Sequence, residues 1–214
     1  DEVPGTHVNL LVDLVRDTGP EWCARTLEQV IEVAPEAGIV GITIGGSEHA
    51  FPPAPYAGVY RRAGEAGLGR TVHAGEAGGS ENVWTALRDL GVDRVGHGVR
   101  AVDDPALIDH LVERQVPLEV CPTSNLRTGV VASWEHHPVI EMVERGAYVT
   151  INSDDPTYFG CSLAAELREV AAATSLDLAA ATRAAIDASF ADEAERVRLH
   201  TLVGAAQPRG ATSP

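Results

Sequence analysis

The sequence predicts an α/β fold with a parallel sheet, and three observations carry this prediction. Short apolar runs rich in β-branched residues alternate along the chain with longer, helix-like stretches. Polar residues with metal-binding or proton-transfer chemistry directly follow three of these runs. After the last apolar run the chain becomes helical and alanine-rich. Such alternation is typical of βαβ units, in which crossover helices connect parallel strands.

Six strands are predicted in order along the chain. Each contains valine, isoleucine, leucine or threonine, residues that favour the pleated, half-buried surface of a sheet. Their ranges are His7–Asp13, Val40–Ile44, Arg70–His73, Arg94–Gly96, Leu118–Cys121 and Tyr148–Asn152. A complete (β/α)8 barrel has eight strands and about 250 residues. We therefore expect a partial (β/α)8, TIM-like barrel of about six βα units, with the shortfall at the amino end and additional helices at the carboxyl end.

Helices are predicted between these strands and after the last one. Their ranges are Glu21–Ala34, Tyr56–Glu65, Ser80–Leu90, Pro105–Glu113, Pro138–Arg145, Ser162–Thr174 and Leu178–His200. Local signals mark several helix ends. Ser80 and Asp104 are candidates for the N-cap, and Asp104 precedes a proline at the first helical position. Gly91 and Gly146 stand just past helices, where glycine is favoured.

The composition is that of a globular protein, and we expect one domain over residues 1–214. Hydrophobic residues make up 44% of the 214 residues, enough for one sizeable core. No apolar run approaches the roughly 20 residues of a membrane helix. The acidic start, Asp1 to Pro4, is unlike a signal peptide. The 3 cysteines are far apart and in no Cys-x-x-Cys spacing, so we expect no disulfide and a cytoplasmic location.

The charged residues exclude several function classes. The net charge of -15 argues against binding to the phosphate backbone of a nucleic acid, which requires clustered cations. All 16 cationic residues are arginine. The absence of lysine excludes Schiff-base lysines, P-loop lysines and lysine-derived metal bridges from this segment. The expected partner is a small molecule, with neither nucleic acid nor membrane, and the oligomeric state is left open.

Three short motifs place metal-ligating and proton-transferring residues directly after predicted strands. They are His73-Ala-Gly-Glu76, Gly96-His97-Gly98 and Ser153-Asp-Asp-Pro156. In βα-repeat proteins the carboxyl ends of the strands form one rim, where catalytic groups converge. We therefore expect His73, Glu76, His97 and the aspartate pair to surround one pocket.

Each motif also has a plain structural interpretation. His73 and Glu76 can be a strand-end histidine and a helix-starting glutamate, and His97 can be a satisfied core residue. The pair Asp154-Asp155 can be a solvated turn. Two adjacent carboxylates at a strand end repel each other, however, unless a cation or donor compensates. Because all three motifs fall at the same end of the predicted strands, we favour a catalytic metal site.

The three motifs in this order resemble the adenosine deaminase family. The resemblance continues through Gly41–Glu48, Glu119–Asn125 and Ala188–Phe190, so that it covers nearly the whole chain. It implies a (β/α)8 barrel that holds one zinc ion per chain. It also implies hydrolytic removal of the 6-amino group of a purine nucleoside, the reaction that converts adenosine to inosine and ammonia.

The resemblance implies roles for the residues of the motifs. His73 and Asp154 would be zinc ligands. Glu76 would donate a proton to the purine ring nitrogen beside the attacked carbon. His97 would orient the zinc-bound water or take a proton from it. These roles agree with physical chemistry, since zinc lowers the pKa of bound water to about 7 and a glutamate with a raised pKa suits a proton donor.

Two further residues are implied to bind the substrate. Asp155 would form a hydrogen bond with another ring nitrogen of the purine. Gly46 would offer its backbone N–H to the base. Together with the metal and proton-transfer groups, these residues would hold the ring against the metal.

The sequence departs from the pattern of the family at several positions. The family carries a His-x-His pair on its first strand, which supplies two zinc ligands, and this chain lacks the pair. Neither His7 nor the adjacent His136–His137 is assigned as a ligand. His73 and Asp154 alone fall short of the usual three protein ligands of a catalytic zinc. Thr43 stands where the family usually has Asp, and Ala184 where it often has Asn.

Other enzyme activities are alternatives to adenosine deamination. The same chemistry on adenine or aminodeoxyfutalosine is the nearest alternative, and comparing kcat/KM values over a substrate panel separates them. A two-metal amidohydrolase with a lysine-derived bridge is disfavoured by the absence of lysine. The deaminases that flip bases out of nucleic acids use Pro-Cys-x-x-Cys, which is absent here.

A non-enzymatic alternative is a truncated, inactive barrel, or one that only binds a purine. About one tightly bound zinc per chain favours the enzyme, and none favours the inactive barrel. An open barrel also exposes the edges of its first and last strands, which promotes association. The sequence therefore predicts that this chain alone is poorly soluble or self-associates.

Overall fold

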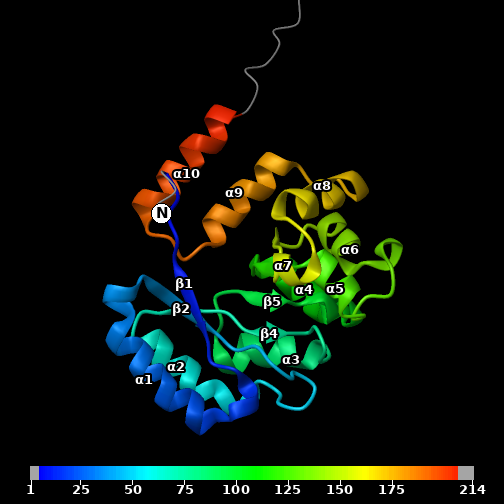
Figure 1. Cartoon of the computed structure of the whole chain (residues 1–214). Helices are drawn as coiled ribbons and strands as arrows, with labels where there is room; N and C mark the ends of the chain where they lie inside the picture. Colours follow the sequence, from blue (N-terminus) through cyan, green and yellow to red (C-terminus); the bar gives the residue numbers. More distant parts are fainter. Residues whose placement is uncertain (1–4, 207–214) are drawn as a thin grey trace, which may run out of the picture.

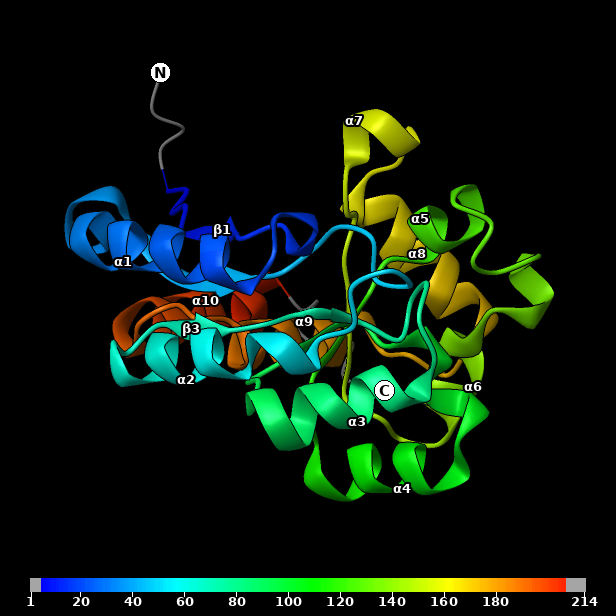
Figure 2. The ribbon, with the colours of Figure 1, turned by 90° about the horizontal axis from the view of Figure 1, so that it is seen from below.

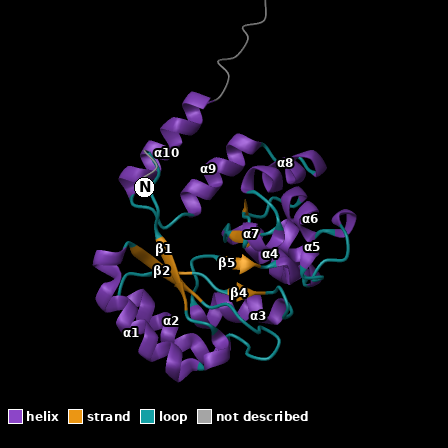
Figure 3. Ribbon diagram, in the orientation of Figure 1, coloured by secondary structure: helices purple, strands orange, loops and turns teal. Residues whose placement is uncertain are grey.

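The computed structural model describes residues 5–206, and its strands are all parallel. The strands are β1 Leu10–Asp13, β2 Ile39–Thr43, β3 Gly69–Arg70, β4 His73–Ala74, β5 Val95–His97, β6 Leu118–Val120 and β7 Val149–Ile151. They form two sheets, in the orders β1-β2-β3 and β4-β5-β6-β7. Figure 3 labels β1, β2, β4 and β5 among the strands. The strand order follows the chain, as βα units connected in series require.

The two sheets are joined because β3 and β4 continue one another. The Thr71 amide donates to the Ile42 carbonyl (3.0 Å), and the His73 amide donates to the Ile44 carbonyl (3.1 Å). On the other side, the Gly96 amide donates to the Val72 carbonyl (2.8 Å). Hydrogen bonding therefore runs across residues 69–74 as along one strand. The six predicted strand positions are confirmed, and the parallel strands with helices outside them form part of a (β/α)8 barrel.

The helices lie outside the strands (Figures 1 and 2). Their bounds are α1 Pro20–Ala37, α2 Ala57–Glu65, α3 Ser80–Thr85, α4 Pro105–Arg114, α5 Pro122–Arg127, α6 Pro138–Glu144, α7 Pro156–Phe159, α8 Leu163–Ala173, α9 Leu178–Ala188 and α10 Glu193–Ala206. Between sheet and helices, Leu27, Ile42, Tyr60, Leu107 and Leu118 are at most 1% exposed. Burial of such apolar side chains stabilises the fold by about 25 cal/mol per Å².

The predicted helix ends are confirmed in part. Asp104 caps α4, with its carboxylate accepting from the Ala106 amide at 2.9 Å. Gly91 and Gly146 have the expected positive φ, 60° and 76°. The N-cap expected at Ser80 is wrong, because Gly79 takes that position and no side chain caps α3. The predicted helix Ser80–Leu90 continues past α3 as a wider π-helical turn over Ala86–Leu90.

The prediction of one long helix over Leu178–His200 is also wrong, because the helix is interrupted at residues 189–192. Ser189 ends α9 in an extended conformation, and Asp192 starts α10 by accepting from the Glu195 amide (2.8 Å). The break places the Phe190 ring beneath the Arg94 guanidinium, 3.7 Å from the ring centroid. The same ring packs on Gly69, where an added Cβ would lie 2.6 Å away. The short helices α5 and α7 were not predicted.

No helix within residues 5–206 is both long enough and apolar enough to cross a membrane. The segment from Asp1 to Pro4, on which the expectation of no signal peptide rested, lies outside the described residues.

The free edge of β1 generates the first testable prediction. Among the described residues β1 pairs with β2 alone, and its Leu10 side chain is 49% exposed. Because an unpaired, apolar strand edge is a template for association, we expect the chain to self-associate. Leu10→Lys should shift sedimentation-velocity profiles toward the monomer. Leu163→Lys, at a 47% exposed leucine that begins α8, is the matched control and should leave the profile unchanged. A wild-type chain that stays monomeric at all concentrations contradicts the prediction.

The second prediction concerns His137, which begins α6. Its Nδ1 accepts from the Val139 amide (3.1 Å), and the side chain is 2% exposed. Burial lowers the pKa of His137 to about 4. As the pH falls, His137 therefore binds a proton in the unfolded chain at a higher pH than it does in the folded chain. Stability should therefore fall as the pH drops from about 6.5 toward 4, by roughly 2–3 kcal/mol from this group.

Denaturant unfolding across this pH range tests the effect. His137→Asn keeps an N-cap side chain but does not titrate, so it should flatten the pH dependence. His136→Asn, at the neighbouring histidine that contacts Ser133, is the control and should retain the wild-type slope. An unchanged slope in His137→Asn contradicts the prediction.

Candidate active site

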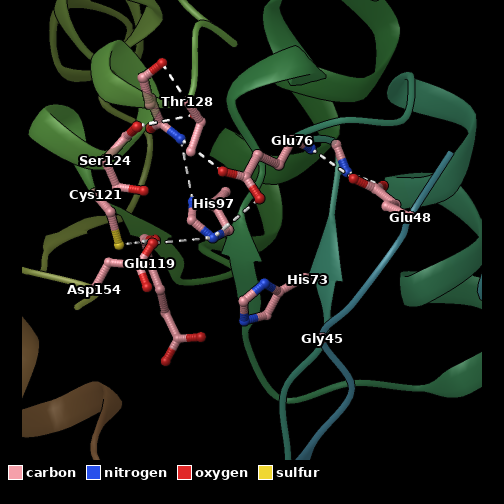
Figure 4. Close-up of polar contacts among 12 residues, drawn as sticks. Gly45, Glu48, His73, Glu76, His97, Glu119, Cys121, Ser124, Thr128 and Asp154 are labelled. Carbon is pink, nitrogen blue, oxygen red and sulfur yellow. Dashed lines mark hydrogen bonds and ion pairs between the residues drawn. The ribbon is translucent and has the colours of Figure 1, made fainter. Parts of the chain in front are cut away.

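Four of the predicted site residues, His73, Glu76, His97 and Asp154, lie at the carboxyl ends of the strands (Figure 4). His73 lies on β4, His97 ends β5, and Asp154 follows β7. Two groups of potential ligand atoms, each within 4.8 Å of one another, form here. The first contains His73, Glu76 and His97, and the second contains His97, Cys121 and Asp154. His97 is common to both, so the three motifs converge on one place.

His97 is the centre of this cluster. Its ring packs edge-on against the His73 ring, with centroids 4.9 Å apart and planes at 71°. Its Nε2 lies 3.4 Å from a Glu76 oxygen and 3.9 Å from an Asp154 oxygen. The His97 side chain is only 3% exposed, whereas Asp154 is 26% exposed. The cluster is therefore a partly buried set of acidic and imidazole groups with one open side.

The backbone is strained at two of these residues. His97 has φ 59° and Asp154 has φ 53°, in the left-handed region that non-glycine residues rarely occupy. Each turns the chain sharply after its strand and directs the side chain back toward the cluster. Strain of this kind persists where surrounding structure enforces it, and it concentrates at functional sites.

The environment of the cluster shifts two pKa values in opposite directions. Burial, together with the negative charges of Asp154 and Glu48, raises the pKa of Glu76 to about 7. Burial and the neighbouring His73 ring lower the pKa of His97 well below its ordinary value. Near neutral pH, Glu76 can hold or release a proton while His97 is neutral. Such separated pKa values are typical of acid–base sites.

Sequence reasoning did not assign a role to Glu48, which fixes the Glu76 loop. One Glu48 oxygen accepts from the Gly75 amide (2.6 Å) and the Asn82 side chain (3.0 Å). The other oxygen accepts from the Glu76 and Gly78 amides (3.0 and 2.8 Å). Glu48 is 3% exposed, so its charge is satisfied almost entirely by this loop. The only sequence signal was its place at the end of the Gly41–Glu48 segment.

Arg16 is a second buried charge that the sequence did not reveal. Its guanidinium donates to the Gly45 carbonyl (3.1 Å), the Ile44 carbonyl (3.0 Å), the Phe51 carbonyl (3.0 Å) and the His73 carbonyl (2.5 Å). The side chain is 0% exposed. Arg16 therefore ties the loop after β2 to the start of β4, where His73 lies.

Asn125 on α5 also belongs to the cluster and was not singled out. Its side-chain nitrogen lies 3.3 Å from Glu76 Oε1 and 3.2 Å from His97 Nδ1. The carboxylate of Glu166 on α8 holds the start of α5 by accepting from the Thr123 amide (3.0 Å). The unpredicted helix α5 therefore places an amide between two residues of the site.

Gly46 and Asp155 lie beside the cluster rather than within it. Gly46 has φ 94°, and an added Cβ would lie 2.1 Å from an Asp17 oxygen, so the loop requires glycine there. The Asp17 carboxylate holds this loop by accepting from the Ser47 amide (2.8 Å). Asp155 precedes α7 and is exposed, and neither metal-ligating group contains it.

The donors present fit a zinc ion in part. Imidazole nitrogen and carboxylate oxygen are donors that zinc accepts. His73 and Asp154 belong to different groups of potential ligand atoms, and the two groups share His97. Cys121 is nearby, but burial raises the pKa of its thiol, which disfavours the thiolate that metals bind. His7 contacts Asn9, and His137 caps α6.

A cavity at the opposite end of the sheet has a different character. A cavity of about 560 Å³ opens there beside Arg94 and Phe190. Arg94 is paired with Glu119 at 2.8 Å and stacks on Phe190. These groups satisfy one another, and in barrel folds this face serves stability. The acidic and imidazole groups of the cluster lie instead at the carboxyl ends of the strands.

Known proteins are similar to this chain in sequence and in fold. The family model described as adenosine deaminase matches residues 2–206. The aminodeoxyfutalosine deaminase of Streptomyces avermitilis is 40% identical over 200 residues, which cover 91% of this chain and 56% of that protein. An adenosine deaminase of Serratia proteamaculans is 37% identical and is covered to 60%. The chain thus spans little more than half the length of these relatives.

Solved structures match over the same portion. The adenine deaminase of Arthrobacter aurescens superposes with a TM-score of 0.82 at 36% identity, over 89% of this chain and 59% of that structure. An amidohydrolase of Burkholderia ambifaria, described with bound zinc, gives a TM-score of 0.85 at 28% identity, over 94% of this chain and 57% of that structure. From the extent of the family match, the geometry of the three motifs and the shared fold, the chain belongs to the adenosine deaminase family.

Proposed function

We propose that this chain carries the catalytic residues of a hydrolytic deaminase acting on a 6-aminopurine. One observation supports this above the others: Glu76, with a pKa raised to about 7, faces His97 and Asp154 at one rim. Hydrolysis of an aromatic amine needs a proton donor at the ring and an activated water at the carbon. Glu76 can supply the first, and a metal held at the rim can supply the second.

His73 and Asp154 are the residues that would hold the metal, which we propose is one zinc ion per chain. When bound, zinc supplies a Lewis acid that lowers the pKa of a coordinated water to about 7. His73 begins β4, and Arg16 holds this point of the strand through the His73 carbonyl, which supports this role. Asp154 reaches the same place through its left-handed turn after β7.

Glu76 is the proposed proton donor to the purine ring. Protonation of the ring nitrogen beside the attacked carbon makes that carbon electrophilic, and a carboxylic acid with a pKa near neutrality suits this step. Its loop is fixed by Glu48, so the acid needs little rearrangement before reaction. His97 would orient the attacking water or take its proton, as its place between Glu76 and Asp154 allows.

The remaining proposed roles concern the purine itself. Asp155, at the start of α7, would accept or share a hydrogen bond with a ring nitrogen. Gly46 would present its backbone N–H to the base from the loop after β2. Gly46 has a positive φ, which residues other than glycine rarely adopt, and this conformation sets the direction of its N–H.

We propose adenosine as the substrate. Adenine and aminodeoxyfutalosine are the alternatives, because some relatives are named for these activities. Proteins named for each of these three activities are similar to this chain. Adenosine and aminodeoxyfutalosine are nucleosides, whereas adenine is the free base. A panel of the three, compared by kcat/KM, assigns the substrate.

We further propose a cytoplasmic location. Cys23, Cys121 and Cys161 are all free thiols. Cys23 and Cys121 are buried, which protects them, and no disulfide links the three. Free thiols are the usual state in a reducing compartment.

Metal loading and ammonia release test the proposed function together. The purified chain should retain about one zinc after dialysis, measured by elemental analysis. With zinc bound, it should release ammonia from at least one purine of the panel. Glu76→Gln should keep the zinc and lose about 10²–10⁴-fold in kcat.

Asp154→Ala should lose zinc, whereas Asp103→Ala, at an exposed aspartate on the surface, should retain it. A chain that binds zinc but releases no ammonia from any of the three purines contradicts the proposed reaction. A chain that binds no zinc supports the inactive or purine-binding alternative.

The contacts of Glu48 generate a separate prediction. Glu48→Gln removes the charge that three backbone amides share, so the Glu76 loop should loosen while the fold is kept. Because misplacement of a catalytic group is costly, kcat should fall by about 10–100-fold with little change in KM. Steady-state kinetics measure the change, and Glu81→Gln, at an exposed glutamate on α3, is the control. Equal kinetics in the two variants would show that the Glu48 charge does not position Glu76.

A further inference from the structure

The loop after β2 carries two consecutive glycines, Gly45 and Gly46, beside His73. It begins where the His73 amide donates to the Ile44 carbonyl (3.1 Å), and Figure 4 labels Gly45 near His73. Gly46 is exposed, whereas Gly45 is buried. No acceptor among residues 5–206 pairs with the Gly46 N–H. The loop therefore presents a free backbone donor at the carboxyl end of β2.

Arg16 sets the direction of this donor from the other side of the peptide group. The Gly45 carbonyl accepts from the Arg16 amide (3.0 Å) and from Arg16 Nε (3.1 Å). The Gly45 carbonyl and the Gly46 N–H belong to one planar peptide unit, in which the two groups point in opposite directions. The Gly46 N–H therefore points away from the buried Arg16 side chain.

Two exposed carboxylates hold the amides on either side of this donor. Asp13 accepts from the Gly45 amide (2.8 Å), and Asp17 accepts from the Ser47 amide (2.8 Å). Asp17 also accepts from the Ser47 hydroxyl (2.6 Å). The Ser47 hydrogen bonds lower the pKa of Asp17, so its carboxylate is ionised at neutral pH. The Gly46 N–H thus lies between two amides that already have acceptors.

The same carboxylates explain why both positions are glycine. A Cβ on Gly45 would collide with Asp13 Oδ2, and a Cβ on Gly46 would collide with Asp17 Oδ2. Two consecutive glycines give a loop many accessible conformations, so a defined N–H direction depends on contacts from outside the loop. Arg16 supplies such a contact on the amino side of Gly46, and Asp17 supplies one on its carboxyl side.

We propose that Asp17 is a positioning residue that fixes the direction of the Gly46 N–H for a hydrogen bond to the purine base. The inference rests on the proposed function, which assigns this N–H to the base. Asp17 acts through Ser47 and not by contact with the substrate. Because the base would keep this hydrogen bond throughout the reaction, the bond should strengthen binding rather than accelerate the chemical step.

Amide-proton exchange tests the donor without turnover. The ¹⁵N-labelled full chain is measured by NMR with zinc added, with and without the deaminated product of each purine in the panel. Without product, the Gly46 amide should exchange faster than those of Gly45 and Ser47, which the two aspartates hold. At least one product should slow the exchange of Gly46 by about 5-fold or more, as a new hydrogen bond requires. Gly46 exchange that no product slows overturns the proposal.

Asp17→Ala tests whether the carboxylate is the cause. Loss of both Ser47 contacts should raise KM by about 3–10-fold, the effect of one neutral hydrogen bond, and leave kcat within about 2-fold. The same variant should lose the protection of Gly46 by product. This pattern is the opposite of that expected for Glu48→Gln, in which kcat falls and KM is kept. An unchanged KM, or a loss confined to kcat, overturns the proposal.

Asp17→Asn is the conservative variant that should restore binding. Its amide oxygen can accept from the Ser47 amide and its nitrogen can donate to the Ser47 hydroxyl, so KM should stay near the wild-type value. Asp89→Ala, at an exposed aspartate of the π-helical turn, removes an equal charge elsewhere and should not change KM. A KM in either variant as high as in Asp17→Ala would assign the effect to charge and overturn the proposal.

The outcome is separable from that of the proposed function. A chain in which product protects Gly46 but which releases no ammonia contradicts the deaminase reaction alone. A chain that releases ammonia while no product protects Gly46 contradicts the role of Asp17 alone. The wild-type exchange measurement needs no variant, so the proposal stays falsifiable if Asp17→Ala does not fold.

Discussion

The rim of this fold depends on two buried charges that are neutralised by the backbone. Glu48 binds the amides of the loop after β4, and Arg16 binds carbonyls at the ends of β2 and β4. A buried charge without partners is very costly, so each charge requires the loop to adopt the shape that satisfies it. The loops in turn require the charges, because their own polar groups would otherwise be unpaired. The positions of His73 and Glu76 follow from this mutual requirement.

A second constraint acts where β5 and β7 end. His97 and Asp154 are held in left-handed conformations that cost of order 1–3 kcal/mol each. Relaxation of either residue would turn its side chain away from the other. The packing of His97 against His73, and its burial beneath α5, keep the strained arrangement in place. The fold itself therefore holds the side chains of His97 and Asp154 in place, as preorganised sites require.

Much of the architecture could be predicted because it depends on local patterns. The β-branched runs gave the strand positions, and the motifs at their carboxyl ends brought His73, Glu76 and His97 together. Neither group of potential ligand atoms contains Asp155, and the proposed role of Gly46 rests on its backbone N–H alone. Their roles depend on a purine that local patterns in the chain do not describe.

Other features depended on contacts between distant residues. Glu48 lies 27 positions before Gly75, and nothing in its neighbourhood reveals that its partner is a loop amide. The sequence did not reveal the role of Asn125, because α5 has only 6 residues and begins at a proline just after β6. A helix of this length is too short to show helical periodicity in the sequence. The break after α9 was hidden for the opposite reason: its alanine-rich flanks favour one long helix. The Phe190 contacts with Arg94 and Gly69 override that preference.

The Phe190 contacts have a consequence for how the protein unfolds. Arg94 is 8% exposed and donates to the Ala188 carbonyl (2.8 Å), so the end of α9 and the Phe190 ring together shield its charge. Detachment of the last two helices would strip this cover and leave a guanidinium half-buried beside Glu119 alone. Separate melting of the carboxyl-terminal helices is thereby penalised. The sheet and these helices should open as one cooperative unit, with amide protons on both sides of the turn exchanging at similar rates.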